Sequence, residues 1–301
     1  MLRSLLLLLL LATPPVQAEE KLPALVDVSW LLAHADAPGL VLLDIQPRSY
    51  YRQVHLAGAL SAPFERWRSS VPQGVRDMLP PTPQLEGLLG RLGVTPKDRL
   101  VLVSSGLGAG DMAAAARVFW TLKVLGHGQV AILDGGLNAV ASDERGARLL
   151  TNVPASRPVA RYQAKPDFSL LADAAATQAT VERGELLVDA RTDAEFLGIH
   201  VGDAGERPGT LPGAHNLPFD WLTENGSAQM LPVTRLRSLM DAVGIDPAVP
   251  QVHFCHSGNR AALTWFAAYA LLGNRQARLY DASMLEWATR DDLPMERRVQ
   301  F

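Results

Sequence analysis

The stretch QVHFCHSGNR, residues 251–260, decides how the rest of the chain is interpreted. Its apolar beginning predicts a strand, and residues 261–272 predict a helix that stops at Gly273. Cys255, the single cysteine among 301 residues, therefore falls in a strand-to-helix loop. Backbone N–H groups and the helix N-terminus in such a loop favour a thiolate and can hold an anion. A buried structural cysteine is the other interpretation, and the polar loop argues against it.

The composition is that of a globular protein without a nucleic-acid footprint. The net charge is −3 and the pI is about 6.2, whereas nucleic-acid-binding domains are usually basic. A length of 301 residues predicts about two domains. A single cysteine cannot form an internal disulfide, so the thiol is free for chemistry.

Residues 1–18 are organised like a secretory signal peptide. Arg3 supplies a positive charge, residues 5–12 form a short apolar segment, and residues 16–18 (Val-Gln-Ala) are a small-residue cleavage site. The apolar segment is shorter than a typical transmembrane helix. We therefore expect export, to the bacterial periplasm, and no stable membrane anchor once the signal is cleaved. An uncleaved anchor is the alternative.

The remainder of the chain consists of two similar copies of one unit. Similar motifs recur in the same order in the two halves: residues 40–44 match 186–189, 56–59 match 211–214, 92–94 match 243–245, and 130–134 match 277–281. The second copy carries about ten extra residues around positions 202–208. Self-similarity of this length indicates a duplicated domain.

Each copy alternates short apolar strands with helical segments. The predicted helices include residues 27–34, 84–92, 112–125 and 234–243. This alternation predicts an α/β fold of two tandem domains, each a parallel sheet flanked by helices on both faces. We place the first domain at residues 19–150 and the second at 167–301. Residues 151–166 contain three prolines and are the expected linker.

The loop of the first copy lacks the thiol. The strand at residues 100–103 leads into residues 104–111, which contain no cysteine, so only the second copy can be catalytic through a thiol. Residues 106–110 (Gly-Leu-Gly-Ala-Gly) partly match a dinucleotide-binding turn, but Asp111 stands where the third glycine belongs. A degenerate copy of the cysteine loop is the simpler account, and no nucleotide or other cofactor is expected.

No metal site is expected either. His253, Cys255 and His256 lie close together in sequence, but their spacing matches no standard zinc site and a fourth ligand is missing. His253 lies within the predicted strand, where we expect it at most to support Cys255.

Four motifs together resemble the tandem-domain rhodaneses, which are sulfurtransferases that pass sulfane sulfur through a cysteine persulfide. The motifs are residues 187–191, similar to a strand that ends in Asp-x-Arg; residues 208–216, similar to a Gly-His-Ile-Pro-Gly-Ala segment with Thr210 in place of the usual His; residues 255–260, similar to the active-site loop; and residues 279–287, similar to a closing Asp-Gly-Gly or Asp-Gly-Ser segment followed by Trp. The resemblance covers residues 22–295 and implies the duplicated α/β fold.

The loop length separates this resemblance from the related cysteine phosphatases. Those enzymes need five residues between Cys and Arg, which makes a loop wide enough for a phosphate. Here four residues separate Cys255 from Arg260. The tighter loop suits a single sulfur atom better than a phosphoryl group.

The resemblance implies a two-step reaction between a small sulfur donor and a cyanide or thiol acceptor. The Cys255 thiolate takes the outer sulfur of the donor, and the acceptor then removes it. The N–H groups of the loop are expected to stabilise the persulfide. The loop residues expected to bind substrate are His256, Ser257, Gly258, Asn259 and Arg260.

Several of these side chains have two interpretations. Arg260 either holds an anionic donor or turns back to brace the loop. His256 either assists the donor and the thiol or lies exposed at the rim, and Ser257 either hydrogen-bonds the leaving group or is only a small loop residue. Asp189 and Arg191 are expected to pair with each other and support the end of the sheet.

The loop sequence matches neither of the two donor classes of the resembled family. Thiosulfate-specific relatives resemble Cys-Arg-Lys-Gly in the loop and mercaptopyruvate-specific relatives resemble Cys-Gly-Ser-Gly, whereas residues 255–258 read Cys-His-Ser-Gly. Glu195 also stands where tandem relatives often place a substrate-binding Arg. We expect thiosulfate, because Arg260 and His256 would keep the loop cationic. A 3-mercaptopyruvate or persulfide donor is the alternative, as is an exported sulfur carrier with little turnover.

Overall fold

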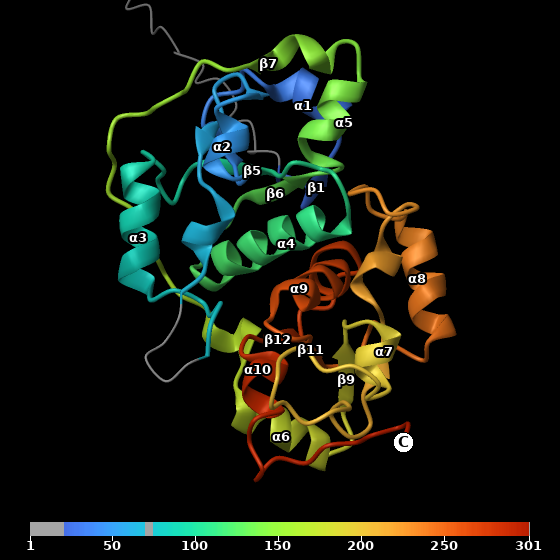
Figure 1. The fold of residues 1–301 in the computed structure, drawn as a ribbon. Helices are drawn as coiled ribbons and strands as arrows, with labels where there is room; N and C mark the ends of the chain where they lie inside the picture. Colours follow the sequence, from blue (N-terminus) through green and yellow to red (C-terminus); the bar gives the residue numbers. More distant parts are fainter. Residues whose placement is uncertain (1–20, 70–74, 301) are drawn as a thin grey trace, which may run out of the picture.

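The computed structural model describes residues 21–69 and 75–300, and the predicted signal segment at residues 1–18 lies outside this range. The described chain forms two α/β halves that pack against each other (Figure 1). Among the described helices, none combines the length and the apolar character needed to cross a bilayer.

Each half contains one five-stranded parallel sheet. In the first half the order is β1 (Leu25–Val26), β6 (Val130–Leu133), β5 (Arg99–Val103), β2 (Leu40–Asp44) and β4 (Leu60–Ser61). In the second it is β8 (Leu171–Ala172), β12 (Ala277–Tyr280), β11 (Gln251–Phe254), β9 (Leu186–Asp189) and β10 (His215–Asn216). The two orders are the same when the strands are matched in sequence, which confirms the predicted duplication and the α/β class.

The helices also recur in matching places. The first half contains α1 (Val28–His34), α2 (Arg48–Tyr51), α3 (Thr82–Arg91), α4 (Ala109–Val124) and α5 (Gly136–Ser142). The second contains α6 (Ala174–Glu182), α7 (Asp193–Phe196), α8 (Val233–Ala242), α9 (Asn259–Phe266) and α10 (Ser283–Trp287). The single helix predicted after Cys255 is divided, because a π-helical segment at Ala267–Leu271 continues α9.

Alternate residues of the strands face two different helical layers. In the first sheet, Val101 and Leu133 pack in one buried cluster with Leu31 of α1 and Leu137 of α5. Leu102, next to Val101, points the other way, into the cluster that contains α4. Helices therefore cover both faces of the sheet, as predicted for parallel strands.

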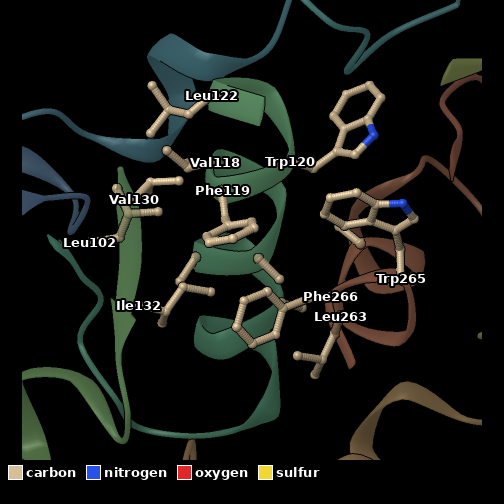
Figure 2. Close-up of a cluster of buried hydrophobic side chains, with 14 of the residues drawn as sticks. Leu102, Val118, Phe119, Trp120, Leu122, Val130, Ile132, Leu263, Trp265 and Phe266 are labelled. Atoms are coloured by element: carbon tan, nitrogen blue, oxygen red, sulfur yellow. The ribbon is translucent and has the colours of Figure 1, made fainter. Parts of the chain in front are cut away.

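A single hydrophobic core joins the two halves. Helices α4 and α9 lie side by side between the two sheets (Figure 1), and both contribute to the same buried cluster. Figure 2 shows Phe119 of α4 against Phe266 of α9, and their rings meet edge to face with centroids 4.9 Å apart. Trp120 and Trp265 are also fully buried. The two halves are thus held together by one shared apolar core.

The connection between the halves is packed rather than loose. Thr151 still belongs to β7 (Leu150–Thr151), which pairs antiparallel with β3 (His55–Leu56), and residues 152–167 follow without helix or strand. Within this segment the Ala160 N–H donates to the Gly90 carbonyl and the Lys165 N–H to the Leu125 carbonyl. The predicted linker therefore follows the surface of the first half.

Candidate active site

Cys255 lies at the carboxyl edge of the second sheet, immediately after β11. Its side chain is buried, with 1% of the residue exposed. The chain turns through His256 and Ser257 to Gly258, whose left-handed backbone (φ 72°) leads into α9. A Cβ at Gly258 would lie 2.6 Å from the Asp281 carbonyl oxygen, so only glycine fits this turn. The loop thus places the thiol beside the N-terminus of α9, as the sequence indicated.

A second segment completes the cradle around Cys255. The Cys255 N–H donates to the Ser283 hydroxyl (3.1 Å), and that hydroxyl donates to the Tyr280 carbonyl (2.7 Å). The Met284 N–H donates back to the Cys255 carbonyl (3.1 Å). Ser283 is fully buried and adopts φ 53°, a strained value for a residue with a side chain.

Ser283 was not among the predicted site residues. It lies in the closing motif at residues 279–287, and the first copy has Gly136 at the matching position. That difference between two otherwise similar segments, next to the difference between Cys255 and Ser104, is the signal that could have identified it.

Arg260 turns back toward the chain and braces the loop by pairing with Glu195. Its two terminal nitrogens donate to the two carboxylate oxygens of Glu195, each at 2.7 Å. Glu195 is itself held by Thr192, which forms a capping box with it at the start of α7. Burial alone would raise the pKa of Glu195, but the hydrogen bonds and charge of Arg260 outweigh it and hold that pKa at about 2.

The pKa of Arg260 lies above its ordinary value for the converse reason. Burial opposes the charge, and the hydrogen bonds to Glu195 together with the electrostatic attraction of nearby acidic groups outweigh that penalty. Of the two interpretations of Arg260, the brace is therefore the one that the structure shows. Glu195, which the sequence marked only as an unfavourable acid, is its partner.

His256 lies under the insertion of the second copy rather than exposed at a rim. Its Nε2 is 2.8 Å from a carboxylate oxygen of Glu206 and 3.8 Å from one of Asp203. The histidine side chain is 14% exposed and Glu206 only 4%. A Cβ at Gly202 would lie 2.2 Å from the His256 ring, so a glycine is needed where the insertion crosses the loop.

The insertion is fastened at both ends. Asp203 forms an ion pair with Arg76 of the first half (2.7 Å). Arg207 donates to the carbonyl of Trp287 at the end of α10 and to that of Leu293 in the segment that follows, each at 2.9 Å. The insertion thus connects the first half, the cysteine loop and the last helix.

Both basic side chains of the loop face carboxylates. The positive charge that Arg260 and His256 were expected to bring to the loop is therefore offset in part, because Glu195 and Glu206 lie against them. Both acids come from segments that are distant in sequence, and their pairing could not be read from the loop itself.

One cluster of metal-type ligands occurs among the described residues. Donor atoms of Asp203, Glu206 and His256 lie within 4.8 Å of one another. Glu206 already accepts hydrogen bonds from the N–H groups of Gly202 and Asp203, and Asp203 is paired with Arg76. This arrangement is accounted for as an ion-pair and hydrogen-bond network.

Asp189 and Arg191 lie at the end of β9, paired with each other. Arg191 contacts both carboxylate oxygens of Asp189, at 2.6 Å for the closest, and also donates to the Gly209 carbonyl. The Thr210 hydroxyl, which replaces the histidine usual in the resembled family, donates to the same carboxylate (2.8 Å). Both charged residues are buried, so they support the sheet end rather than reach a substrate.

The remaining predicted residues lie in or beside the loop. Ser257 is partly exposed, and Asn259 begins α9 with its side-chain oxygen buried and unpartnered. His253 is fully buried within β11, where its Nδ1 meets the Thr264 hydroxyl at 3.0 Å. Burial lowers the pKa of His253 to about 3, so this histidine is neutral and takes no part in the loop chemistry.

The loop of the first copy is closed on itself. Ser104 occupies the place of Cys255, and the Asp111 carboxylate accepts the Leu107 N–H at 2.8 Å. A cavity of about 250 Å³ adjoins it, lined in part by Gln46 and Arg68. The acid at Asp111 thus satisfies the loop internally, as expected for a degenerate copy rather than a dinucleotide site.

Comparison with known proteins agrees with this geometry. The model of the rhodanese-like domain matches residues 27–143 and 172–290, one match for each half. A thiosulfate sulfurtransferase of Azotobacter vinelandii is 31% identical over 281 residues, which cover 91% of this chain and 97% of the relative.

Solved structures share the fold at low identity. SseA of Escherichia coli, a 3-mercaptopyruvate sulfurtransferase, superposes with a TM-score of 0.74 at 24% identity, over 87% of this chain and 98% of that one. An anaerobic ergothioneine biosynthesis enzyme of Chlorobium limicola superposes with a TM-score of 0.78 at 17% identity, over 92% and 71%. With a duplicated sheet topology, a cysteine loop in the second half and family matches over both halves, the chain belongs to the tandem-domain rhodanese family of sulfurtransferases.

Proposed function

We propose that this protein transfers sulfane sulfur from a small donor to a thiophilic acceptor through a persulfide on Cys255. The observation that carries the proposal is the loop itself: Cys255, four residues and Arg260, closed tightly against the N-terminus of α9. In the first step the thiolate attacks the outer sulfur of thiosulfate, the S–S bond breaks, and sulfite leaves with the electron pair. In the second step cyanide or a thiolate attacks the outer sulfur and releases the Cys255 thiolate.

The loop favours both steps by electrostatics. The N-terminus of α9 opposes the negative charge that develops on sulfur, and N–H groups of the loop are expected to do the same. The bidentate pair of Arg260 with Glu195 keeps the loop in one shape, with the guanidinium contributing to the field at Cys255. His256, Ser257, Gly258, Asn259 and Arg260 thus act mainly through the shape of the loop and its backbone.

Thiosulfate is the donor that we favour, on the basis of the Azotobacter vinelandii relative. The pairing of Arg260 with Glu195 supports a second candidate, because a neutralised arginine gives less advantage to a doubly charged donor than a free one. A 3-mercaptopyruvate or protein persulfide donor fits such a site. Values of kcat/KM for thiosulfate, 3-mercaptopyruvate and glutathione persulfide, measured at one ionic strength, would rank the three.

The function is tested by mass and turnover together. Incubation with thiosulfate should add about 32 Da, one sulfur atom, to the intact protein, and cyanide should then remove it as thiocyanate. Cys255→Ser is the matched control and should show neither. An adduct that survives Cys255→Ser contradicts the proposal, and a stable adduct on Cys255 that no acceptor removes favours a sulfur carrier.

We further propose that residues 1–18 direct export to the periplasm and are cleaved after Ala18. The support is the arrangement of Arg3, the apolar residues 5–12 and the small residues before Glu19. Mass spectrometry of the protein purified from its native host should give a mature chain that starts at Glu19. A chain that starts at Met1 and fractionates with the cytoplasm contradicts the proposal.

A further inference from the structure

One buried arginine of the first half contacts the cysteine loop of the second half. The first half lacks a cysteine and is called the silent half below. Arg117 lies in the middle of α4 and is 0% exposed. Its guanidinium forms a short ion pair with Asp281 and donates to the carbonyl of Gly258 at 3.4 Å and to that of Asp77 at 3.3 Å. It also lies over the Trp120 ring, 4.5 Å from the centroid. Its position is therefore fixed from several sides.

The two groups that Arg117 contacts in the second half are the two sides of the Cys255 cradle. Gly258 ends the cysteine loop and leads into α9. Asp281 follows β12, two residues before Ser283, whose hydroxyl accepts the Cys255 N–H. One guanidinium thus connects the loop that carries the thiol to the segment that supports it.

Steric fit confirms how closely these groups meet. A Cβ at Gly258 would lie 2.6 Å from a terminal nitrogen of Arg117 and 3.2 Å from a carboxylate oxygen of Asp281. The second carboxylate oxygen of Asp281 accepts the Leu79 N–H at 2.7 Å. Both oxygens of this carboxylate are therefore held by the first half of the chain.

The positions that correspond to Arg117 and Asp281 in the opposite copies do not form a second ion pair of this kind. Alignment of Leu125-Gly126 with Leu272-Gly273 places Thr264 of α9 opposite Arg117, and Asp134 opposite Asp281. Asp134 accepts the Met230 N–H at 2.8 Å, and within residues 21–69 and 75–300 it forms no salt bridge. Burial raises the pKa of Asp134. The interdomain carboxylate contact is thus present in both copies, whereas the arginine serves the copy that carries the cysteine.

Interdomain stability alone does not explain this choice of residue. A buried ion pair costs desolvation of both charges, and apolar residues of similar volume often stabilise a core as well or better. Arg117 also leaves its Nε buried without a partner. The surrounding residues of α4, such as Phe119 and Trp120, already supply apolar contacts between the halves.

We propose that Arg117 is a positioning residue for sulfur transfer, a role that rests on the proposed function. It fixes the Gly258 carbonyl and Asp281, so that the loop N–H groups keep facing the sulfur on Cys255. Its positive charge also offsets that of the Asp281 carboxylate, which would otherwise oppose the Cys255 thiolate. The catalytic half is incomplete without this side chain of the silent half.

Two single variants should shift the pH midpoint of Cys255 thiolate formation in opposite directions. Arg117→Met leaves the Asp281 charge uncompensated and should raise the pH midpoint of thiolate formation by about one unit or more, whereas Asp281→Asn leaves Arg117 in excess and should lower it. The thiolate is followed by its ultraviolet absorbance, with Cys255→Ser as the blank. Because the chain has one cysteine, the signal belongs to Cys255.

Measurements of turnover distinguish the effect of the Arg117 charge from the effect of its contacts on loop position. Arg117→Lys keeps the charge but cannot reach Asp281, Gly258 and Asp77 together, so its thiol midpoint should stay within about 0.5 pH unit of wild type. Its kcat with thiosulfate and cyanide should fall about tenfold or more at an unchanged KM for cyanide. Asp134→Asn, which alters the matching contact of the silent half, is the control and should change neither quantity.

The outcomes distinguish this role from a structural one and from failure of the proposed function. If Arg117→Met and Arg117→Lys are folded by circular dichroism and retain both the wild-type midpoint and kcat within twofold, the positioning role is wrong. An unchanged or raised midpoint in Asp281→Asn, a variant that keeps the arginine, also contradicts it even if Arg117→Met does not fold. The thiol titration needs no donor, so it tests Arg117 even if wild type fails to turn over thiosulfate.

Discussion

Glu195→Gln tests the brace that holds Arg260 in place. Glutamine has nearly the shape of a protonated glutamic acid, so this variant resembles the wild-type protein with Glu195 neutral. Burial by itself raises the pKa of Glu195. The hydrogen bonds and charge of Arg260 outweigh burial and lower this pKa from 4.5 to about 2. Each pKa unit corresponds to about 1.4 kcal/mol, so the ionised form stabilises the fold by about 3 kcal/mol relative to the neutral form. Glu195→Gln should therefore lower the free energy of unfolding at pH 7 by about that amount.

The same contribution has a defined pH window. A carboxylate whose pKa is depressed in the folded state stabilises it above the unfolded pKa, and that stability is lost as the pH falls through the folded pKa. The difference in unfolding free energy between wild type and Glu195→Gln should be full at pH 7 and shrink between pH 4.5 and 2.

Urea unfolding at a series of pH values measures this difference. Glu65→Gln, at an exposed glutamate of the first half, is the matched control and should differ little from wild type at any pH. A Glu195→Gln difference below about 1 kcal/mol at pH 7, or one that does not change down to pH 2, would refute the reasoning. In the same variant the KM for thiosulfate should fall, because Arg260 becomes an uncompensated cation beside Cys255.

Three further predictions concern the loop and its strand. Gly258→Ala should lose about 2–4 kcal/mol in urea unfolding, because φ is 72° and the new Cβ meets Arg117, whereas Gly110→Ala, with open space around its Cβ, should not destabilise the protein. Ser283→Ala should lose about 1–3 kcal/mol and slow thiocyanate formation, since the buried Cys255 N–H loses its acceptor; equal rates and stabilities would contradict the cradle. Because burial lowers the pKa of His253 from 6.5 to about 3, the unfolded state binds a proton first as the pH falls, and stability should drop by up to about 1.4 kcal/mol per unit between pH 6.5 and 3. The variant His253→Phe should lack that part of the slope in urea unfolding; an identical slope would show that His253 is not buried neutral.

Local patterns predicted the architecture well because strands and helices depend on neighbouring residues. The strands at residues 40–44 and 186–189 coincide with β2 and β9, and the predicted duplication is visible in the matching strand orders. Apolar runs followed by turn residues define such strands regardless of what packs on them. The tandem-rhodanese resemblance was confirmed by family matches to both halves.

The partners of the loop were not predictable in the same way. Arg260 pairs with Glu195, 65 residues away, and His256 with Glu206, 50 residues away. Both acids come from the segment between β9 and β10, whose insertion has no counterpart in the first copy and no periodic pattern. The donor prediction depended on the charges of Arg260 and His256, and the fold shows that each of these side chains meets a carboxylate. Residue types in a loop indicate its chemistry, whereas its net field depends on which distant segment folds over it.

The shared core of α4 and α9 also has a consequence for how the chain is made. Synthesis proceeds from the N-terminus, so α4 (from Ala109) emerges about 150 residues before α9 (from Asn259). Until then the side of α4 that carries Phe119 has no partner helix to cover it. Truncated chains that end before α9 should therefore aggregate or depend on chaperones. Cys255 and its loop are among the last parts to be assembled, so the candidate site forms only after the first half is complete.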